Sequence, residues 1–506
     1  MLTVIPIAAV CRLILGQGCM AREILDHLIS PSQNAFVPGR LISDNVLLAQ
    51  ELFSGYNQCR LPPRCALKVD LRKAYDTVEW DFLFATLRMF GFPAVFIGWI
   101  KECVTSAHYS VVVNGGVHGF FAGARGLRQG DPMSPYLFVL VMEVLHMILQ
   151  QFIEQDGEFR YHWRCQDMNL FQLSFADDLL LFCKADMRSV NLFCRGLDLF
   201  ATLSGLQTNP QKSQLIISKA ASGLRESLLA ALGFQEGHLP VRYLGLPLIS
   251  ARLSVQIANH CFRRLTAVLK GGKESSCPLL EEYLSSGYPK VAWETVCRPI
   301  EEGGLGIKDI LALNRALMSK HLWAVIKQDR TSIWVDWIIQ VRLRDCSIWT
   351  VKDNKGAWGW RKMLSLRHTL MSHIHYRVGR GDSISLWHDP WHPLGPLITR
   401  FPRGPQMTRI GILDKLSIVI KEGQWNWPLI TDIACVEITH VLPLFRRART
   451  KLVGRQRMAP LTPPELMKSS THRVPRFSGP PSCWAHSKFR RTALFFGLLL
   501  WGDCLH

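Results

Sequence analysis

Cysteine is scarce in this sequence, with 15 among 506 residues, and no two cysteines form a CxxC pair. This excludes a disulfide scaffold and argues against a zinc ribbon or a thioredoxin-type site. The apolar run at residues 493–501 has nine residues, about half of what a membrane span requires. Residues 1–16 are apolar but lack a basic n-region, which argues against a secretory signal. We therefore expect an intracellular protein, nuclear or cytoplasmic, without a membrane segment.

Acidic residues are also in the minority. Asp and Glu number 40 against 59 Lys and Arg, which gives a formal net charge of +19. Residues 441–506 alone contain 12 basic and 2 acidic residues, so the last part of the chain carries about half of the excess. A strongly basic chain indicates a polyanionic partner, and nucleic acid more than a membrane surface.

Alternating helix and strand patterns extend to about residue 250. The apolar positions of residues 80–90 recur at helical spacing, with Gly91 ending that helix and Pro93 opening the next. Asn114-Gly115-Gly116 between two apolar runs predicts a β-hairpin at 109–121. The pattern further predicts a long apolar helix at 135–152, strands at 171–175 and 179–182, a helix at 189–203 and a strand at 214–218.

Beyond residue 250 the pattern is less regular. Residues 254–270 predict one amphipathic helix, and residues 273–287 resemble a linker. Residues 288–442 are rich in tryptophan and are expected to hold a core of their own. Residues 443–506 combine seven prolines with the basic excess, so we expect this tail to be largely disordered.

Three aspartates stand at the ends of apolar runs. Asp70 follows the run at 65–69, and Asp177 and Asp178 lie between the two strands predicted at 171–182. Strand ends and hairpin tips can bring such carboxylates together. Clustered carboxylates repel one another unless a cation neutralises them, and their hard oxygens suit Mg²⁺. Two Mg²⁺ ions about 4 Å apart can activate a hydroxyl and stabilise a leaving pyrophosphate, although an isolated Asp-Asp pair is more often a solvated turn.

Sequence blocks around these aspartates resemble a known family. Phe175-Ala176-Asp177-Asp178 resembles the F/Y-x-D-D hairpin of reverse transcriptases, and residues 69–76 (VDLRKAYD) resemble their first catalytic strand and turn. Residues 126–135 (GLRQGDPMSP) resemble the loop that holds the template base and the nucleotide, residues 205–213 (GLQTNPQKS) the lysine-bearing motif that follows, and residues 33–40 (QNAFVPGR) a fingers element. The residues of these blocks are most similar to those of plant non-LTR retrotransposons of the long interspersed type, and the chain resembles a truncated copy.

The resemblance implies an α+β right-hand polymerase with an intact palm. The expected division is a divergent segment at 1–27, partial fingers and palm at 28–250, a reduced thumb or linker at 251–287, a Trp-rich, mostly helical region at 288–442 and the basic tail at 443–506. The implied activity is RNA-directed DNA synthesis, in which dNTPs are added to a DNA primer 3′-hydroxyl on an RNA template. Two Mg²⁺ ions, or Mn²⁺ in their place, are the implied cofactors. No protein partner is indicated.

The resemblance also implies roles for single residues. Asp70, Asp177 and Asp178 would be catalytic residues and metal ligands. In the same picture Tyr75 would exclude a 2′-hydroxyl, Leu71, Ala74, Gln129 and Gly130 would contact the nucleotide, and Lys212 would neutralise or protonate the pyrophosphate. Other interpretations stay open, namely a core tyrosine, a structural loop and a solvated lysine. Arg40 could approach the template or the triphosphate, or serve only at the surface.

Departures from the family pattern leave a second function open. Residues 1–24 contain no Arg-Pro-Ile-Ser-like block, whose arginine grips the triphosphate in relatives, and 251–287 is short for a thumb. We expect weak nucleotide and primer-template binding, and an inactive remnant that at most binds nucleic acid is the alternative. A two-metal nuclease lacks a recognisable Glu or His set. His388 and His392 have zinc-compatible spacing, but Pro390 would interrupt a helix between them, which favours packed histidines.

Overall fold

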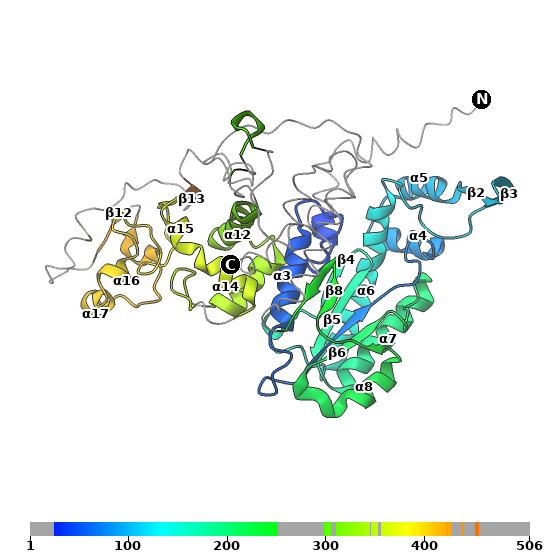
Figure 1. Ribbon diagram of the computed structural model, residues 1–506, viewed down its shortest axis with the longest axis horizontal. Coiled ribbons are helices and arrows are strands. Elements are labelled where there is room, and N and C mark those ends of the chain that lie inside the picture. Colours follow the sequence, from blue (N-terminus) through cyan, green and yellow to red (C-terminus); the bar gives the residue numbers. More distant parts are fainter. Residues whose placement is uncertain are drawn as a thin grey trace. The chain divides into compact units, whose positions relative to one another are not determined.

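The computed structural model in Figure 1 describes residues 25–250, 298–304, 310–344, 346–352, 356–422, 424–427 and 451–454, together with Thr295 and Ile438. These residues fall into two compact units. The first contains residues 25–250 and, from much later in the chain, residues 330–337. The second contains the other described residues. The helix expected at 254–270 and the thumb expected at 251–287 lie outside the described residues.

A five-stranded sheet forms the centre of the first unit, in the order β4-β5-β1-β6-β7 (Figure 1). Its strands are β1 (Arg64–Val69), β4 (Gln172–Phe175), β5 (Asp178–Lys184), β6 (Gln214–Ile217) and β7 (Gln235–Glu236). β1 is buried over nearly its whole length and pairs antiparallel with both β5 and β6. The last paired residues of β1 and β5 are Val69 and Leu179. Asp70 and Asp178 therefore come next to each other at one edge of the sheet.

Local sequence signals set the ends of the helices in this unit. The helices are α3 (Ile42–Phe53), α4 (Trp80–Met89), α5 (Ala94–Thr105), α6 (Ser134–Asp156), α7 (Met187–Ser204), α8 (Arg225–Leu232) and α13 (Ile333–Trp337). Pro135 lies in the first turn of α6, and Gly157 ends this helix in the left-handed conformation. Asp186 caps α7 by accepting a hydrogen bond from Ser189 N, and Gly205 ends it. These are ordinary start and stop signals, and the helices predicted at 80–90, 135–152 and 189–203 are confirmed.

Helices α6 and α7 pack against each other and carry much of the core. Their buried apolar residues belong to one cluster with residues of β1 and β5. The two helices approach closely at Gly196, where an added Cβ would collide with Leu149 of α6. By length and composition α6 could cross a membrane, but 61% of its most apolar window is buried inside the protein. Its apolar character is explained by its place in the core.

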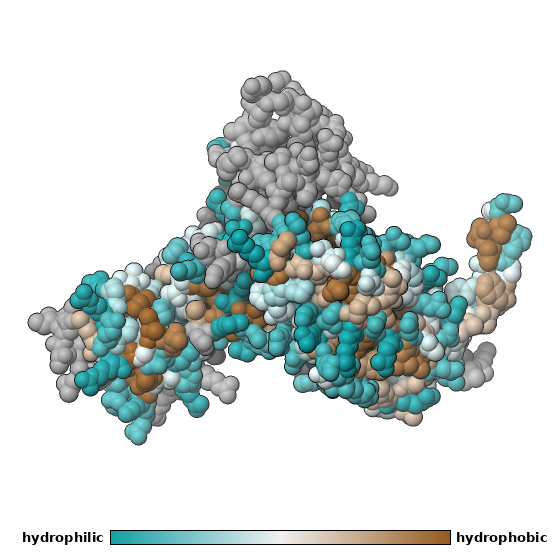
Figure 2. Space-filling model, turned by 90° about the horizontal axis from the view of Figure 1, so that it is seen from below, coloured by the Kyte–Doolittle hydropathy of each residue, from teal (hydrophilic) through white to brown (hydrophobic). Residues whose placement is uncertain are grey.

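The hairpin predicted at 109–121 is confirmed as β2 (His108–Val113) and β3 (Gly116–Ala122). Unlike the central sheet, both strands are exposed over almost their whole length. Val112, Val117 and Phe120 are 67, 71 and 77% exposed, and Figure 2 shows the hydrophobic colour of this projection. Residues 103–124 contain no Asp, Glu, Lys or Arg. The hairpin therefore presents an uncharged apolar surface outside the core.

A small sheet and two short turns complete the first part of the chain. β8 (Val241–Tyr243) pairs with β9 (Leu246–Leu248), and β9 packs against α3. Turns of 3-10 helix occur at η1 (Gln166–Met168) and η2 (Lys219–Leu224). Buried polar side chains of α3 bind this region, since Asn45 donates to the Tyr243 hydroxyl at 3.2 Å and Gln50 donates to Ile249 O at 2.7 Å.

Helix α13 comes from the Trp-rich region yet packs against α3. Trp334 and Trp337 are 1 and 0% exposed. The indole Nε1 of Trp337 donates a 2.8 Å hydrogen bond to Arg164 O, so the ring is anchored at its polar end as well. The boundary predicted at residue 288 therefore does not separate all of the Trp-rich region from the first unit.

The second unit consists of short helices and two-stranded sheets. Its elements are η3 (Ile300–Glu302), α12 (Ile310–Ile326), η4 (Ile338–Leu343), α14 (Trp358–Ser365), α15 (Arg367–Met371), β10 (Ile374–Arg377), α16 (Leu397–Arg400), α17 (Gly404–Thr408), η5 (Leu416–Val419), β11 (Ile420–Lys421), β12 (Gln424–Trp425) and β13 (Lys451–Gly454). Trp387 and Trp391 lie in a separate core cluster, which confirms a core of this region's own. β13 pairs antiparallel with β10, so the disorder expected for residues 443–506 does not hold for these four residues.

Candidate active site

The three aspartates lie at one edge of the central sheet. Asp70 directly follows β1, Ala176 and Asp177 form the two-residue turn between β4 and β5, and Asp178 opens β5. The chain turns through Ala176 with a φ of +55°, a left-handed conformation that is uncommon for a residue with a side chain. The fold thus brings Asp70 beside two carboxylates from a distant part of the sequence.

The charges of Asp70, Asp177 and Asp178 affect one another's pKa. Burial, and then the negative charges of Asp177 and Asp70, raise the pKa of Asp178 to about 6, while Lys68 lowers it. Burial and the charge of Asp70 also raise the pKa of Asp177. Although Asp177 reaches solvent, the protein packed around its carboxyl disfavours the charged form. A cation at this edge would relieve the repulsion.

The donor set fits a hard divalent cation. Carboxylate oxygens are the ligands that Mg²⁺ prefers, and this ion is usually held by one or two carboxylates together with substrate phosphates and water. Within the described ranges, no three His, Cys, Asp or Glu side chains form a ready-made set of metal ligands. The convergence of all three aspartates on metal ions therefore stays a prediction, while their mutual repulsion favours a cation beside them.

The turn that follows Asp70 is held on one side by the loop after α7. The backbone N–H of Arg72 donates to Gln207 O at 2.9 Å, and that of Asn209 donates to Asp70 O at 2.8 Å. Ser213 Oγ accepts a hydrogen bond from the N–H of Asp70 at 3.0 Å. These bonds bring the lysine-bearing block directly beside the first aspartate.

The start of the GLRQG block holds the other side of the same turn. Leu127 N donates to Tyr75 O at 2.7 Å, and Gly126 N donates to Val78 O at 2.8 Å. Gly126 has a φ of +90°, and an added Cβ would lie 2.6 Å from Asp76 O. Only glycine combines this conformation with such a close approach, which explains the first glycine of the block.

Tyr75 lies between the core and the aspartates. Its ring stacks on Phe138, with centroids 4.5 Å apart and planes inclined by 17°. Burial and the negative charge of Asp177 raise the pKa of its hydroxyl above the ordinary value. The ring is thus packed on a core residue while the hydroxyl lies within the field of the hairpin aspartate.

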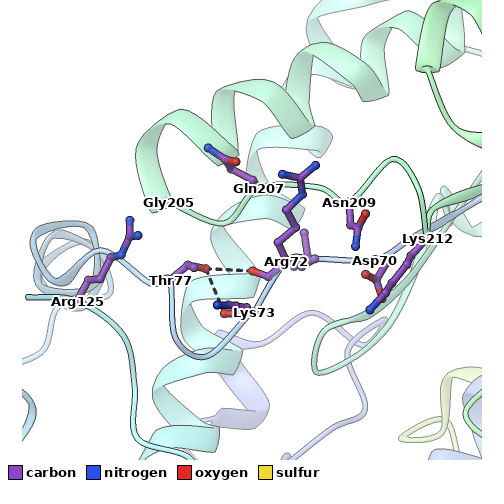
Figure 3. A pocket seen from close by; sticks show the side chains of 10 residues that line it. Asp70, Arg72, Lys73, Thr77, Arg125, Gly205, Gln207, Asn209 and Lys212 are labelled. Carbon is purple, nitrogen blue, oxygen red and sulfur yellow. Dashed lines mark hydrogen bonds between the residues drawn. The ribbon is translucent and has the colours of Figure 1, made fainter. Parts of the chain in front are cut away.

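A cavity of about 440 Å³ opens beside Asp70 (Figure 3). It is lined by Asp70, Leu71, Arg72, Lys73, Thr77, Arg125, Gly205, Gln207, Asn209 and Lys212. Four of these side chains are basic and one is acidic, and Figure 3 shows Lys212 next to Asp70. Thr77 Oγ1 donates to the carbonyl oxygens of Arg72 and Lys73, both at 3.3 Å. A cavity of this charge suits an anion such as a phosphate group.

Only some of the residues predicted to contact the nucleotide line the cavity. Leu71 and Lys212 line it, whereas Ala74, Gln129 and Gly130 do not. Ala74 is buried in the core. Gln129 is exposed and donates to Asp76 Oδ1 at 3.4 Å, and Gly130 has open space around it. A nucleotide contact by these three residues stays a prediction.

Sequence reasoning did not single out three basic residues of the cavity. Arg72 and Lys73 belong to the block that begins at Val69, and Arg125 directly precedes the GLRQG block. Their charge was a visible signal, but only the turn after Asp70 brings them to one cavity. They are candidate phosphate contacts from the palm itself.

Arg40 belongs to the loop beside β4. Its guanidinium donates to the carbonyl oxygens of Ile29, Ser30 and Gln33 at 2.8, 2.5 and 2.7 Å, and it forms an ion pair with Asp26 at 3.2 Å. All four partners come from the segment just before it. Arg40 therefore holds its own loop and is not directed at a nucleotide or a template.

The histidines with zinc-compatible spacing in the second unit are engaged in hydrogen bonds. His392 Nε2 bonds Ile438 O at 3.1 Å, and its Nδ1 accepts from Leu394 N at 3.1 Å. His388 Nδ1 lies 3.3 Å from Ser385 Oγ. Both ring nitrogens of His392 are used in these hydrogen bonds, which agrees with the interpretation of this residue as a packed histidine.

Comparisons with known proteins agree with the geometry of the first unit. The family model described as "Reverse transcriptase (RNA-dependent DNA polymerase)" matches residues 17–248. The chain is 29% identical over 192 residues to a 149 kDa protein of transposon TX1 from Xenopus laevis, which covers 38% of this chain and 14% of that protein. It is 28% identical over 211 residues to the Pol polyprotein of retrotransposable element R2DM from Drosophila melanogaster, which covers 41% of this chain and 19% of that protein.

A similar solved structure is telomerase from Candida tropicalis in complex with a fragment of telomeric RNA. The TM-score is 0.33 and the sequence identity 13%, over 53% of this chain and 42% of that chain. The chain spans less than one fifth of the length of the TX1 protein and of the R2DM polyprotein.

Proposed function

Because residues 17–248 match the reverse transcriptase family model and the relatives include proteins of transposon TX1 and retrotransposable element R2DM, we propose that this chain is an RNA-directed DNA polymerase that extends a DNA primer on an RNA template. The observation that carries the proposal is the edge of the central sheet, where Asp70 meets the hairpin aspartates beside a basic cavity. Carboxylates can hold the divalent cations that promote nucleotidyl transfer, and basic side chains can bind the phosphate groups of the nucleotide.

The proposed cofactors are two Mg²⁺ ions, replaceable by Mn²⁺, with Asp70 and Asp177 as the main ligands and Asp178 beside them. Divalent ions supply charge neutralisation to the triphosphate and lower the pKa of the attacking 3′-hydroxyl. The protein's part is to hold partly buried carboxylates of like charge at one edge, so that their repulsion is relieved when a cation binds.

The proposed phosphate contacts come from the cavity. Arg72, Lys73 and Arg125 supply positive charge along it, and Lys212 beside Asp70 is in position to neutralise or protonate the pyrophosphate. Arg40 is occupied by its own loop, so it does not compete for this role. The dNTP phosphates would therefore be held mainly by the palm.

Nucleotide selection is assigned to the turn and loop around Tyr75. The ring is fixed on Phe138, so it cannot move aside for a 2′-hydroxyl without losing that contact. Gln129 and Gly130 are assigned to the nucleotide pocket because they are exposed next to this turn.

Primer extension tests the proposal. The full chain is incubated with poly(rA), oligo(dT), dTTP and Mg²⁺, and Asp70→Asn serves as the control because it removes one charge without removing bulk. We expect extension by the parent and a loss of at least about 100-fold in the variant. Equal extension by both proteins would disprove the assignment of Asp70.

The alternative function is an inactive remnant that binds nucleic acid through its positive charge. Nucleic-acid binding without any extension by the parent would support this alternative. We further propose that the chain derives from a plant long interspersed element. The plant origin is inferred from the residues of the five sequence blocks. We also propose an intracellular location, nuclear or cytoplasmic.

A further inference from the structure

A glutamine of the QNAFVPGR block reaches the tip of the catalytic hairpin. Gln33 is 3% exposed, and its Oε1 accepts from the N–H of Ala176 at 3.0 Å while its Nε2 donates to Ala176 O at 3.5 Å. The same Oε1 accepts from the N–H of Ala35 at 3.0 Å. One side chain therefore joins its own loop to the residue that precedes Asp177.

The backbone around Gln33 supports the same contact. Asn34 N donates to Ser174 O at 3.1 Å, and Ser174 N donates to Ser32 O at 2.8 Å. These bonds form a short parallel bridge between residue 33 and β4. The side chain of Gln33 continues this pairing beyond the end of β4, to the turn itself.

The turn needs such support because of its conformation and burial. Ala176 has a φ of +55°, which a residue with a Cβ adopts only where its surroundings hold it. It is also 7% exposed, so water does not readily satisfy its backbone N–H and C=O. Gln33 supplies a partner to both groups, and the position of Asp177 follows from the conformation of Ala176.

A second glutamine offers a matched comparison. Gln50 is 9% exposed, and its Nε2 donates to Ile249 O at 2.7 Å while its Oε1 accepts from Ile249 N at 3.3 Å. The chemistry is the same as at Ala176, but Ile249 does not adjoin an aspartate in the sequence. A comparison of the two glutamines separates a general structural role from an effect on the site.

We propose that Gln33 is a positioning residue for divalent-metal binding, because by holding the backbone of Ala176 it sets Asp177 relative to Asp70. The inference rests on the proposed function in one respect, namely that these two aspartates hold the ion. Groups that orient a metal ligand from behind typically change metal affinity by about 10- to 100-fold when they are removed. Gln33 is itself buried and acts on the ligand through the backbone of Ala176.

The variant Gln33→Asn separates the two contacts. An asparagine keeps a local hydrogen bond to the N–H two residues on, here that of Ala35, but is one methylene too short for Ala176. The affinity of the full chain for Mn²⁺ alone is measured by electron paramagnetic resonance without nucleic acid. We expect Gln33→Asn to weaken it about 10-fold or more. The matched control Gln50→Asn is expected to lower the Tm comparably and to leave Mn²⁺ affinity within about 2-fold of the parent.

Asp70→Asn identifies the relevant Mn²⁺ site. If the parent binds Mn²⁺ in an Asp70-dependent manner and Gln33→Asn binds it equally well, or Gln50→Asn loses as much affinity, the positioning role is wrong while the proposed function stands. If no Asp70-dependent binding exists in the parent, the positioning role is wrong together with the assignment of Asp70 as a ligand of the free protein, and primer extension then decides the proposed function by itself. Should Gln33→Asn not fold, it is combined with Ala176→Gly, since glycine adopts the left-handed turn without strain. The same difference is then expected relative to Ala176→Gly alone.

Discussion

Among single residues, Asp178 shows most directly how the fold changes ionisation. Its pKa rises from the ordinary 3.8 to about 6 because of burial and neighbouring carboxylates. A carboxyl with a raised pKa binds its proton more tightly in the folded than in the unfolded state. The stability that the protein gains from this tighter proton binding is therefore fully present below about pH 4 and is lost as the pH rises through about 6.

The substitution Asp178→Asn should abolish the decrease in stability that accompanies ionisation of Asp178. Asparagine has nearly the same shape and no charge, so the variant is expected to match the parent at pH 4 and to exceed its free energy of unfolding at pH 8 by the order of 2 kcal/mol. Urea unfolding at both pH values, with EDTA present, measures the difference. A variant less stable than the parent at pH 8 would show that the carboxylate is not under repulsion.

Tyr75 is the second residue whose role can be separated by substitution. Tyr75→Val removes the ring that stacks on Phe138, and ribonucleotide incorporation relative to deoxynucleotide is expected to rise by roughly 10- to 200-fold, the range that one misfitting group is worth in a packed pocket. Tyr75→Phe keeps the ring and is expected to keep the selectivity. Single-nucleotide extension with dTTP and UTP gives the ratio. An unchanged ratio in Tyr75→Val would return this residue to a purely structural role.

At the scale of elements, the turn after β1 depends on Gly126, which lets the backbone of the GLRQG block approach it closely. Gly126 and Gly91 both have a positive φ, but only at Gly126 does an added Cβ meet backbone, at Asp76 O, whereas Gly91 has open space. A side chain at either position would adopt a strained left-handed conformation, but only at Gly126 would its Cβ also collide with the backbone. This difference allows the contribution of the close approach to be measured.

We expect Gly91→Ala to destabilise the protein by about 1 kcal/mol, the cost of a left-handed alanine. Gly126→Ala carries the same strain and must also push the turn away from its place, so we expect about 3 kcal/mol or more. Urea unfolding of the full chain compares the two variants. Similar losses would mean that the turn shifts freely, and the glycine of the GLRQG block would then need another explanation.

At the scale of the whole molecule, the first unit includes a helix from beyond residue 330. Trp337 of α13 is fully buried and is hydrogen-bonded to Arg164 O at 2.8 Å. Trp337→Ala should therefore destabilise the first unit by about 3–5 kcal/mol, as for other buried aromatic residues. Hydrogen exchange of β1 and β5 peptides in the full chain reports on that unit. The control Trp99→Ala, at a ring that is 55% exposed, is expected to have a much smaller effect.

The sequence by itself determined the local elements and the chemistry of the site. Asp70 after an apolar strand, the two aspartates at a hairpin and the capping residues Asp186 and Gly205 act on their nearest neighbours in the chain, so their pattern predicts strand, turn and helix ends. The predicted α+β palm rests on such local signals and on the order of the blocks. Roles that need a bound metal or nucleotide, as for Gly130, remain predictions.

Only the tertiary structure decided which distant groups meet. The pairing of β1 with both β5 and β6, the contact of Gln33 with Ala176 and the packing of α13 on α3 join segments that no short-range pattern links. Arg40 shows the same limit, because its charge suggested a phosphate while its carbonyl partners exist only in the folded loop. Long-range contacts depend on the burial and hydrogen bonding of the complete fold, since each must offset the entropy of closing a long loop.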